Sequence, residues 1–450
     1  RQKLIIFAQI NFMEIILCVA YTLFFVFLIN KLKFFKIEGV SAKILSVLFI
    51  IKIASAFAIT LIYTYYYKDN FESDIFKYFE DGKVIHSSIH NNPFDFLRLV
   101  SGIGADVPHL DQYYNLTNFW FKEHDYNLLN DNRTIIRFNA ISLIFSFGYF
   151  NVHNIFMAFI SFTGFTAIFK VFYNYFQEKR NLLIVSVYLI PSVLIWTSGV
   201  LKEGLVMFSL GFILYYSDKL LACKFQWKYV LGLIFTIFLL FISKFYVLLA
   251  IIPGLFSIAA IKLFKNKFAF YIFTSVHVLI FVIFFFFQVV FSHYNLTEIV
   301  SKKQHDFINM IAQINSVGSQ IDIPVLKPSL LSFVKNTPNA LVNSFFRPHI
   351  FEIKSFMYIV PAIENLLIII MFLLMIFFYK KISTDKFLWI WFCISFVLIL
   401  FVLCGLTTPV LGALVRYKVP AIPFLFIIFI TFIDFKKIIE LSNNIIKWKK

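Results

Sequence analysis

The stretch LLIVSVYLIPSVLIWTSGVLKEGLVMFSLGFILYY, from Leu182 to Tyr216, decides the fold. It is mostly apolar, but Lys202 and Glu203 stand side by side near its middle. Two adjacent charges inside the hydrocarbon core of a bilayer would be costly. Pro191, Ser198, Gly199 and Gly204 allow the chain to reach one membrane face and turn back, with the charged pair in the turn. We therefore expect two membrane helices joined by a compact charged turn at a membrane surface.

The rest of the chain has the same apolar character. Of its 450 residues, 60% are hydrophobic and only 14% are charged, whereas a soluble protein carries about a quarter charged residues. The apolar runs fit bilayer-spanning helices of about 20 residues, and the strands of a β-barrel would be shorter and alternating. The sequence predicts an all-α polytopic integral membrane protein, with one transmembrane domain over residues 1–450.

Eleven membrane spans are expected along the chain. They lie near Phe12–Ile29, Ile44–Tyr65, Val152–Tyr173, Leu182–Ser198, Leu205–Tyr216, Tyr229–Ser243, Val247–Ile261, Phe268–Phe291, Phe356–Tyr379, Phe387–Leu406 and Val419–Ile433. The four cysteines fall in or beside apolar segments and suggest neither a disulfide framework nor a zinc site.

The distribution of lysine and arginine predicts the orientation of these spans. With eleven spans, the basic connections near residues 31–43, 179–180, 219–228, 262–267 and 380–386 and the C-terminal tail fall on one side, which is therefore cytoplasmic. The net charge of +17 fits this bias, so we expect no nucleic-acid partner. The two long loops, 68–137 and 292–355, are then extracytoplasmic, and we expect them to form a lid over the membrane core.

Each long loop contains a predicted helix. In the first loop, Asp74–His90 is expected to be a helix at the membrane interface. In the second, Leu296–Val317 is expected to be helical, and the proline-rich stretch Pro324–Pro338 is not.

The first loop carries candidate catalytic residues in FESDIFKYFEDGK, residues 71–83. On a helix Asp74, Tyr78 and Asp81 share one face, because they are spaced i, i+4, i+7. One carboxylate is expected to act as a general base and the other to orient an acceptor hydroxyl or a divalent cation. Tyr78 is a candidate substrate-binding residue. A solvated helix face at the membrane edge would have the same pattern.

Lys202 and Glu203 form the second candidate group. A lysine at the outer membrane surface is suited to hold a lipid phosphate, with Glu203 fixing its position, although a structural ion pair is the alternative.

The third group lies in NSFFRPHIFEIKSFMYIVPAIENLL, residues 343–367. Arg347 is a candidate phosphate ligand and His349 a candidate substrate ligand. Glu364 stands inside the apolar segment, where an acid requires a partner, for which Lys202, Arg347 and Arg416 are the candidates. It is a candidate catalytic residue that would orient one of these cations.

The last group lies in TTPVLGALVRYKVPAIPFL, residues 407–425. Arg416 and Lys418 stand in a short outer turn, against the charge rule, which favours an anionic ligand or a buried acid. The planar guanidinium of Arg416 suits phosphate oxygens. Arg137, in the first loop, is a weaker candidate for substrate binding.

Together these residues place carboxylates and cations on one predicted face. Transfer of a group from a lipid-linked phosphate uses both, because cations neutralise the leaving phosphate and a carboxylate activates the incoming hydroxyl. No P-loop, HExxH, GxGxxG or Ser-His-Asp order occurs. No cofactor is assigned, with a divalent cation as the one candidate.

The chain resembles the membrane glycosyltransferases of the GT-C class in its acidic helix after an early span, its long outer loops and its outer cations. The resemblance implies a polyprenyl-phosphate-linked sugar donor, a membrane lipid partner, and an essential aspartate at Asp74, with Asp81 as the alternative. It is also similar to O-antigen polymerases and ligases, which implies that Arg347 and Arg416 bind the lipid pyrophosphate. The segments PSVLIWTSGVLKEG and LGALVRYKVP resemble membrane proteins of the Bacteroidota.

These observations favour a glycosyltransferase or glycan polymerase at the outer face of a bacterial cytoplasmic membrane. Two other classes stay open. Charged turns between spans also suit a transporter or lipid flippase, and the two loops would serve as docking surfaces in a non-catalytic subunit of a larger envelope complex.

Overall fold

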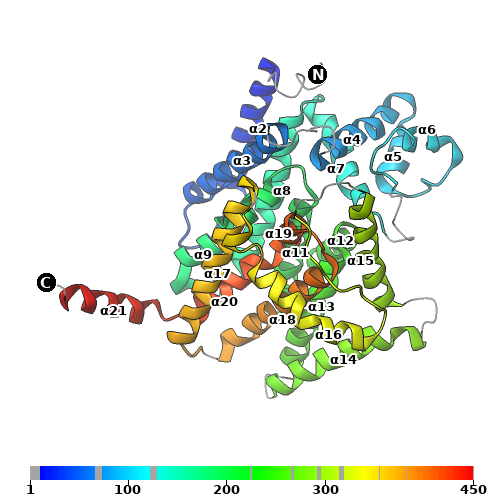
Figure 1. The fold of residues 1–450 in the computed structure, drawn as a ribbon. Coiled ribbons are helices and arrows are strands. Elements are labelled where there is room, and N and C mark those ends of the chain that lie inside the picture. Colours follow the sequence, from blue (N-terminus) through cyan, green and yellow to red (C-terminus); the bar gives the residue numbers. More distant parts are fainter. Residues whose placement is uncertain are drawn as a thin grey trace. The chain divides into compact units, whose positions relative to one another are not determined.

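A computed structural model of the chain describes residues 11–65, 73–121, 129–222, 225–264, 268–290, 295–313, 319–353, 355–382 and 384–448. In these residues every regular element is a helix, and β-structure is limited to isolated bridges (Figure 1). The predicted all-α class is confirmed.

The described residues form two compact units, each made of two stretches of chain. Unit 1 comprises Arg1–Val171 and Leu194–Phe245. Its helices are α2 (Phe12–Lys31), α3 (Ala42–Tyr65), α4 (Asp74–Asn91), α5 (Pro93–Ser101), α6 (Asp111–Tyr114), α7 (Asn132–Ser146), α8 (Phe150–Tyr173), α10 (Pro191–Ser198), α11 (Lys202–Leu221) and α12 (Trp227–Ser243), with short 3-10 turns at Lys33–Phe35 and Pro108–Leu110. Three helices have residues in both units: α8, α10 and α13 (Phe245–Leu263).

Unit 2 comprises Phe172–Val193 and Tyr246–Lys450. Its helices are α9 (Arg180–Tyr188), α13 (Phe245–Leu263), α14 (Ala269–Val290), α15 (Leu296–Gln313), α16 (Leu330–Phe346), α17 (Ile359–Phe377), α18 (Thr384–Thr407), α19 (Leu411–Lys418), α20 (Ile422–Phe432) and α21 (Phe435–Trp448), with 3-10 turns at Gln177–Lys179, Ile350–Glu352, Phe356–Tyr358 and Val419–Ala421.

Nine helices in the described part of the chain are long and apolar enough to cross a membrane. They overlap nine of the eleven predicted spans. The last one begins at Leu411 rather than at Val419, so Arg416 and Lys418, predicted in a short outer turn, lie on a helix within it. The predicted span Leu182–Ser198 is a helix pair bent by 51° at a break before Pro191, and it would be a tenth span if the pair crosses as one. The predicted span Tyr229–Ser243 is α12, which has only 17 residues.

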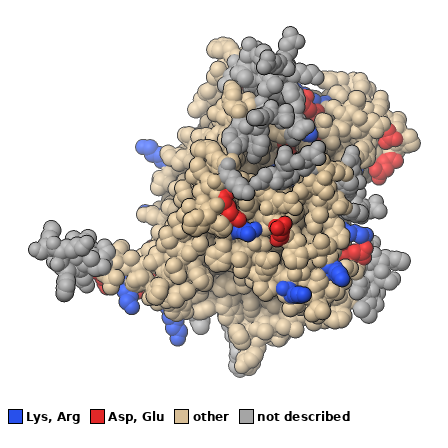
Figure 2. All heavy atoms as spheres, viewed as in Figure 1, with Lys and Arg blue, Asp and Glu red and all other residues tan. Residues whose placement is uncertain are grey.

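Burial of the spans supports a polytopic membrane protein. In the apolar window of α14 only 6% of residues are buried, and in that of α2 only 11%, so the bilayer is the natural cover for their side chains. The window Leu411–Phe432 is 89% buried and lies in the interior of unit 2. On the face drawn in Figure 2, lysine, arginine and acidic side chains occupy little of the visible described surface.

Within each unit, segments predicted to share a membrane face do meet. In unit 1 the Lys170 ammonium, near the end of α8, donates to the Phe34 carbonyl oxygen in the α2–α3 connection at 2.6 Å. In unit 2 the Lys380 backbone N–H, after α17, donates to the Phe432 carbonyl at the end of α20 at 2.7 Å. These contacts agree with the predicted pairing of connections on one face.

The first long loop is folded into the core of unit 1. Phe76 and Phe79 of α4 pack on Phe150 of α8, with ring centroids 5.0 and 5.2 Å apart. A Cβ added to Gly82 would lie 2.5 Å from Cβ of Asn139, so α4 and α7 are in close contact there. The helix predicted over Asp74–His90 is confirmed as α4, and it packs on α7 and α8 within the unit.

The second long loop differs from its prediction. Helix α15 agrees with the expectation up to Gln313, and residues 314–318 lie outside the described part. The expectation that Pro324–Pro338 is not helical is wrong from Leu330 onward, because α16 includes Pro338. Ser329 caps this helix, and a Cβ at Gly405 of α18 would lie 2.1 Å from the Ala340 carbonyl oxygen. Close packing on α18 compensates for the helical hydrogen bond that is lost because Pro338 has no N–H.

Candidate functional site

A break between α10 and α11 positions the site in unit 1. Helix α10 ends at Ser198, as the sequence predicts, but α11 begins at Lys202 rather than at Leu205, so the charged pair lies in the first turn of a helix and not in the turn itself. Glycine is required on both sides of the break. A Cβ at Gly199 would lie 2.7 Å from the Ile59 side chain, and one at Gly204 would lie 2.4 Å from Sδ of Met157. The close approach of α3 and α8 therefore holds Lys202 at the start of α11, inside the packed unit.

Lys202 is buried and bonded to the beginning of α7. Its ammonium lies 2.9 Å from Oδ1 of Asp131 and donates to Oδ1 of Asn132 at 2.7 Å. The Tyr78 hydroxyl of α4 donates to the same Asn132 oxygen at 3.0 Å, and the Lys202 ammonium lies 5.7 Å from the centroid of the Tyr78 ring. Of the predicted site residues, the structure therefore brings Tyr78 and Lys202 together.

A second lysine reaches the same carboxylate. Lys244, which follows the last residue of α12, lies with its ammonium 3.3 Å from Oδ2 of Asp131. The Thr134 hydroxyl donates to the Ile242 carbonyl at 2.8 Å and fixes the start of α7 beside the end of α12. Lys202 is 5% exposed, Lys244 is 5% exposed, and the Asp131 side chain is 14% exposed. Each Asp131 oxygen thus faces one ammonium, in a setting where an uncompensated charge would be costly.

Asp74 and Asp81 lie on the same helix as Tyr78 but in different surroundings. Asp74 is partly exposed in the first turn of α4. Asp81 is fully buried, and its oxygens accept from the backbone N–H groups of Asn118 and Phe119, at 2.7 and 2.8 Å, and from the Asn118 side chain at 2.8 Å. Burial raises the pKa of Asp81, while these hydrogen bonds and the charge of Lys77 oppose the rise. Asp81 therefore has the contacts of a residue that holds a loop.

Glu203 and Arg137 are the other two predicted site residues in unit 1. Glu203 is buried next to Lys202 in the first turn of α11. The guanidinium of Arg137 lies 5.2 Å from the Trp120 ring centroid, and its Nε donates to the Leu99 carbonyl at 3.1 Å. Burial, followed by the charge of Arg133, lowers the pKa of Arg137. Arg137 thus packs against the loop before α7.

In unit 2, Glu364 has a different partner from the expected cation. Its Oε1 accepts from the Ser192 hydroxyl at 2.6 Å and its Oε2 from the Ser192 backbone N–H at 3.0 Å. Ser192 follows Pro191 in the first turn of α10, where backbone N–H groups lack partners within the helix. A carboxylate is favoured at this positive end of a helix, which explains why Glu364 is stable there.

Lys418, Arg347 and His349 also form contacts within unit 2. The Lys418 ammonium donates to the carbonyls of Ser344 and Arg347, at 3.0 and 3.1 Å, and to the Asn365 side chain at 3.0 Å. These bonds use all three donors of an ammonium, so Lys418 has the contacts of a structural residue. Nε of Arg347 lies 3.3 Å from Glu352, and Nε2 of the half-exposed His349 lies 3.5 Å from the same carboxylate. Arg416 is buried on α19.

Asp131, Asn132 and Lys244 were not among the predicted site residues. Lys244 had a usable signal, because it is a single cation in a short predicted outer turn, as Lys202 is. Asp131 had none, since its importance comes only from contacts with residues remote in the sequence.

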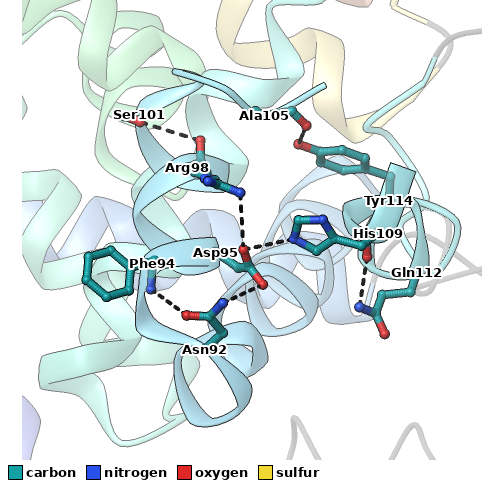
Figure 3. Close-up of polar contacts among 9 residues, drawn as sticks. All are labelled: Asn92, Phe94, Asp95, Arg98, Ser101, Ala105, His109, Gln112 and Tyr114. Carbon is teal, nitrogen blue, oxygen red and sulfur yellow. Dashed lines mark hydrogen bonds and ion pairs between the residues drawn. The ribbon is translucent and has the colours of Figure 1, made fainter. Parts of the chain in front are cut away.

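A second polar cluster orders the loop after α5 (Figure 3). Asp95, whose side chain is 8% exposed, accepts from His109 Nε2 at 3.0 Å and from Asn92 Nδ2 at 3.1 Å, and Arg98 lies 3.8 Å away. Asn92 also caps α5, and the helix ends at Gly102, whose φ of 76° suits glycine. The cluster ties His109 to the helix and explains the fold of this loop.

Across the described residues, no group of three or more histidine, cysteine, aspartate or glutamate side chains is arranged to hold a metal ion. No protein family, curated protein or solved structure matches the chain.

Proposed function

We propose that this protein is a membrane-embedded glycosyltransferase or glycan polymerase that uses a polyprenyl-phosphate-linked sugar. The observation that supports it most is the pairing of one carboxylate, Asp131, with two buried lysines, Lys202 and Lys244, beside a break between spans. Two cations at one point suit a phosphate leaving group, and a carboxylate beside them suits a general base.

In the proposed reaction the acceptor hydroxyl attacks the anomeric carbon of the donor sugar. The bond from that carbon to the phosphate oxygen breaks, and the phosphate leaves as an anion held by Lys202 and Lys244. The proton of the hydroxyl passes to a carboxylate, either Asp131 or the partly exposed Asp74. Tyr78 and Asn132, which share a hydrogen bond, orient the groups around the reacting centre.

The proposal includes the cellular setting. The chain would have eleven spans in a bacterial cytoplasmic membrane, with both long loops and the Asp131 site outside and the C-terminus in the cytoplasm. Arg347 and Arg416 remain candidates for phosphate contacts and His349 for substrate, while Glu364 would fix the start of α10.

The experiment compares Lys202→Met, Lys244→Met and Asp131→Asn with the unmodified protein in transfer from a polyprenyl-phosphate sugar. Each variant is expected to lose on the order of 100-fold or more in rate, because charge stabilisation and proton transfer are each worth that much. Lys228→Met, at an exposed lysine outside the site, is the matched control and should keep its rate. The donor is identified first, by mass spectrometry of co-purified lipids and of glycans that accumulate in a deletion strain. Full transfer by all three variants would contradict the proposal.

A transporter or lipid flippase is the second candidate, and Lys52 favours it. This lysine lies mid-way along the candidate span α3, is 2% exposed, and donates to the Thr197 hydroxyl at 2.8 Å, with its ammonium 4.5 Å from the centroid of the Phe165 ring. An ionisable group in this position is typical of ion or substrate pathways. Lipid movement by the purified protein without a chemical product, lost in Lys52→Met, would favour this class.

A further inference from the structure

Helix α21 begins where the chain leaves the last candidate span. Only Ile433 and Asp434 separate it from α20, and Figure 1 shows it running outward from there. This joint is fixed to the end of α17, because the Asp434 backbone N–H donates to the Phe378 carbonyl oxygen at 2.9 Å. Two candidate spans end at this point, so the first turn of α21 lies at a membrane surface.

The two faces of α21 have opposite character. At about 100° per residue, the polar residues gather on one face and the apolar residues, with Ser442 among them, cover the other. By this spacing in the sequence, Lys436, Lys437, Glu440, Asn443, Asn444 and Lys447 are the polar positions, and Phe435, Ile438, Ile439, Leu441, Ile445 and Ile446 are the apolar positions. Ile439 is 59% exposed and Leu441 is 51% exposed, so the described protein leaves this face largely open.

We propose that α21 lies in the plane of the membrane surface and binds anionic phospholipid head groups. Its apolar face would enter the boundary of the acyl chains, as in other interfacial helices with a lysine-rich polar face. Lys436, Lys437 and Lys447, followed in the sequence by Lys449 and Lys450, outnumber Glu440, which suits an anionic surface. A bilayer is favoured over a second copy of the chain, because the helix is joined directly to a span and two basic faces repel.

Hydrogen exchange of the full-length protein in nanodiscs tests the inference, with one copy per disc so that a second copy is absent. The discs contain phosphatidylcholine alone or with added phosphatidylglycerol. Exchange in residues 435–448 is expected to slow by on the order of tenfold when the anionic lipid is present. Lys436→Gln combined with Lys437→Gln should lose this lipid-dependent slowing, and the same change at Lys380 and Lys381, exposed lysines outside the helix, should keep it.

A matched pair of variants tests the apolar face. Ile439→Ser should accelerate exchange of the helix in both kinds of disc, whereas Asn443→Ser on the polar face should not. Exchange that is independent of the anionic lipid would overturn the head-group assignment. Equal exchange in Ile439→Ser and Asn443→Ser would overturn the in-plane position. The same measurement is made on discs that hold two copies, and slowing that appears only in these would assign the face to self-association instead.

Discussion

At the scale of single residues, the contacts of the buried polar groups distinguish candidate ligand-binding residues from residues whose bonds hold the protein together. Asp131 is shared by two lysines, and 14% of its side chain is exposed. Asp81 and Lys418 have several hydrogen bonds each to the protein itself. The sequence identified both as candidates because a charged residue in or beside an apolar segment suggests a ligand. A charged residue that only holds a loop in place has the same sequence pattern.

Asp81→Asn is expected to destabilise the protein by about 1–3 kcal/mol. An amide would turn its NH₂ group toward one of the N–H donors of Asn118 or Phe119, which leaves a buried donor without an acceptor. Thermal unfolding in detergent measures the effect. Asp106→Asn, at an exposed aspartate in the same loop, is the control and should unfold as the unmodified protein does. A fully stable Asp81→Asn variant that has lost transfer would instead give Asp81 a catalytic role.

Glu364→Gln is expected to be tolerated, within about 1 kcal/mol, because the Ser192 hydroxyl can rotate and accept from the new amide. Glu364→Leu removes both acceptors and should cost about 1–3 kcal/mol. Unfolding and transfer are measured on both variants. If Glu364→Gln is as unstable as Glu364→Leu, the negative charge at the start of α10 matters more than the hydrogen bonds.

At the scale of helices, the sequence predicted which segments are helical better than it predicted how the helices pack. The spans and α4 follow from hydrophobic runs and spacing, so they were predictable. The break after Ser198 was predictable too, because a charged pair and glycine interrupt an apolar run, but the start of α11 at Lys202 rather than at Leu205 was not. The helical state of Pro338 and the ion pairs of Asp131 were not, because both depend on contacts between segments far apart in the sequence.

Glycine contacts between helices give a prediction at this scale. Helices α8 and α11 touch at Gly164 and Gly211, where a Cβ on Gly211 would lie 2.1 Å from the Gly164 carbonyl oxygen. Gly211→Ala should therefore separate the helices and destabilise unit 1 by about 1–3 kcal/mol. Gly412→Ala is a matched control in α19, where a Cβ would be 3.6 Å from the Tyr358 hydroxyl, an ordinary contact. The control should be neutral or slightly stabilising. Equal thermal unfolding of the two variants would contradict the argument.

At the scale of the whole molecule, the two units supply independent evidence about the membrane faces. In unit 1, Lys202 and Lys244 come from two predicted outer turns and meet Asp131 of a predicted outer loop. In unit 2, Lys418 of a predicted outer turn bonds to the Arg347 carbonyl at the end of a predicted outer loop. Each unit therefore keeps its predicted outer segments together, but which face is outside rests on the lysine and arginine bias alone.

Cysteine labelling of intact cells tests that orientation in both units. Single cysteines replace exposed residues in a variant without the native cysteines: Ser101 and Gln226 in unit 1, and Lys327 and Lys381 in unit 2. The charge bias predicts that a membrane-impermeant maleimide labels positions 101 and 327 in intact cells, and positions 226 and 381 only after permeabilisation. The opposite pattern in both units would place the Asp131 site in the cytoplasm, where the proposed outer-face reaction could not occur. Opposite patterns in the two units would mean that the chain crosses the membrane an even number of times between residues 226 and 327. The eleven-span topology has three crossings there and would then be wrong.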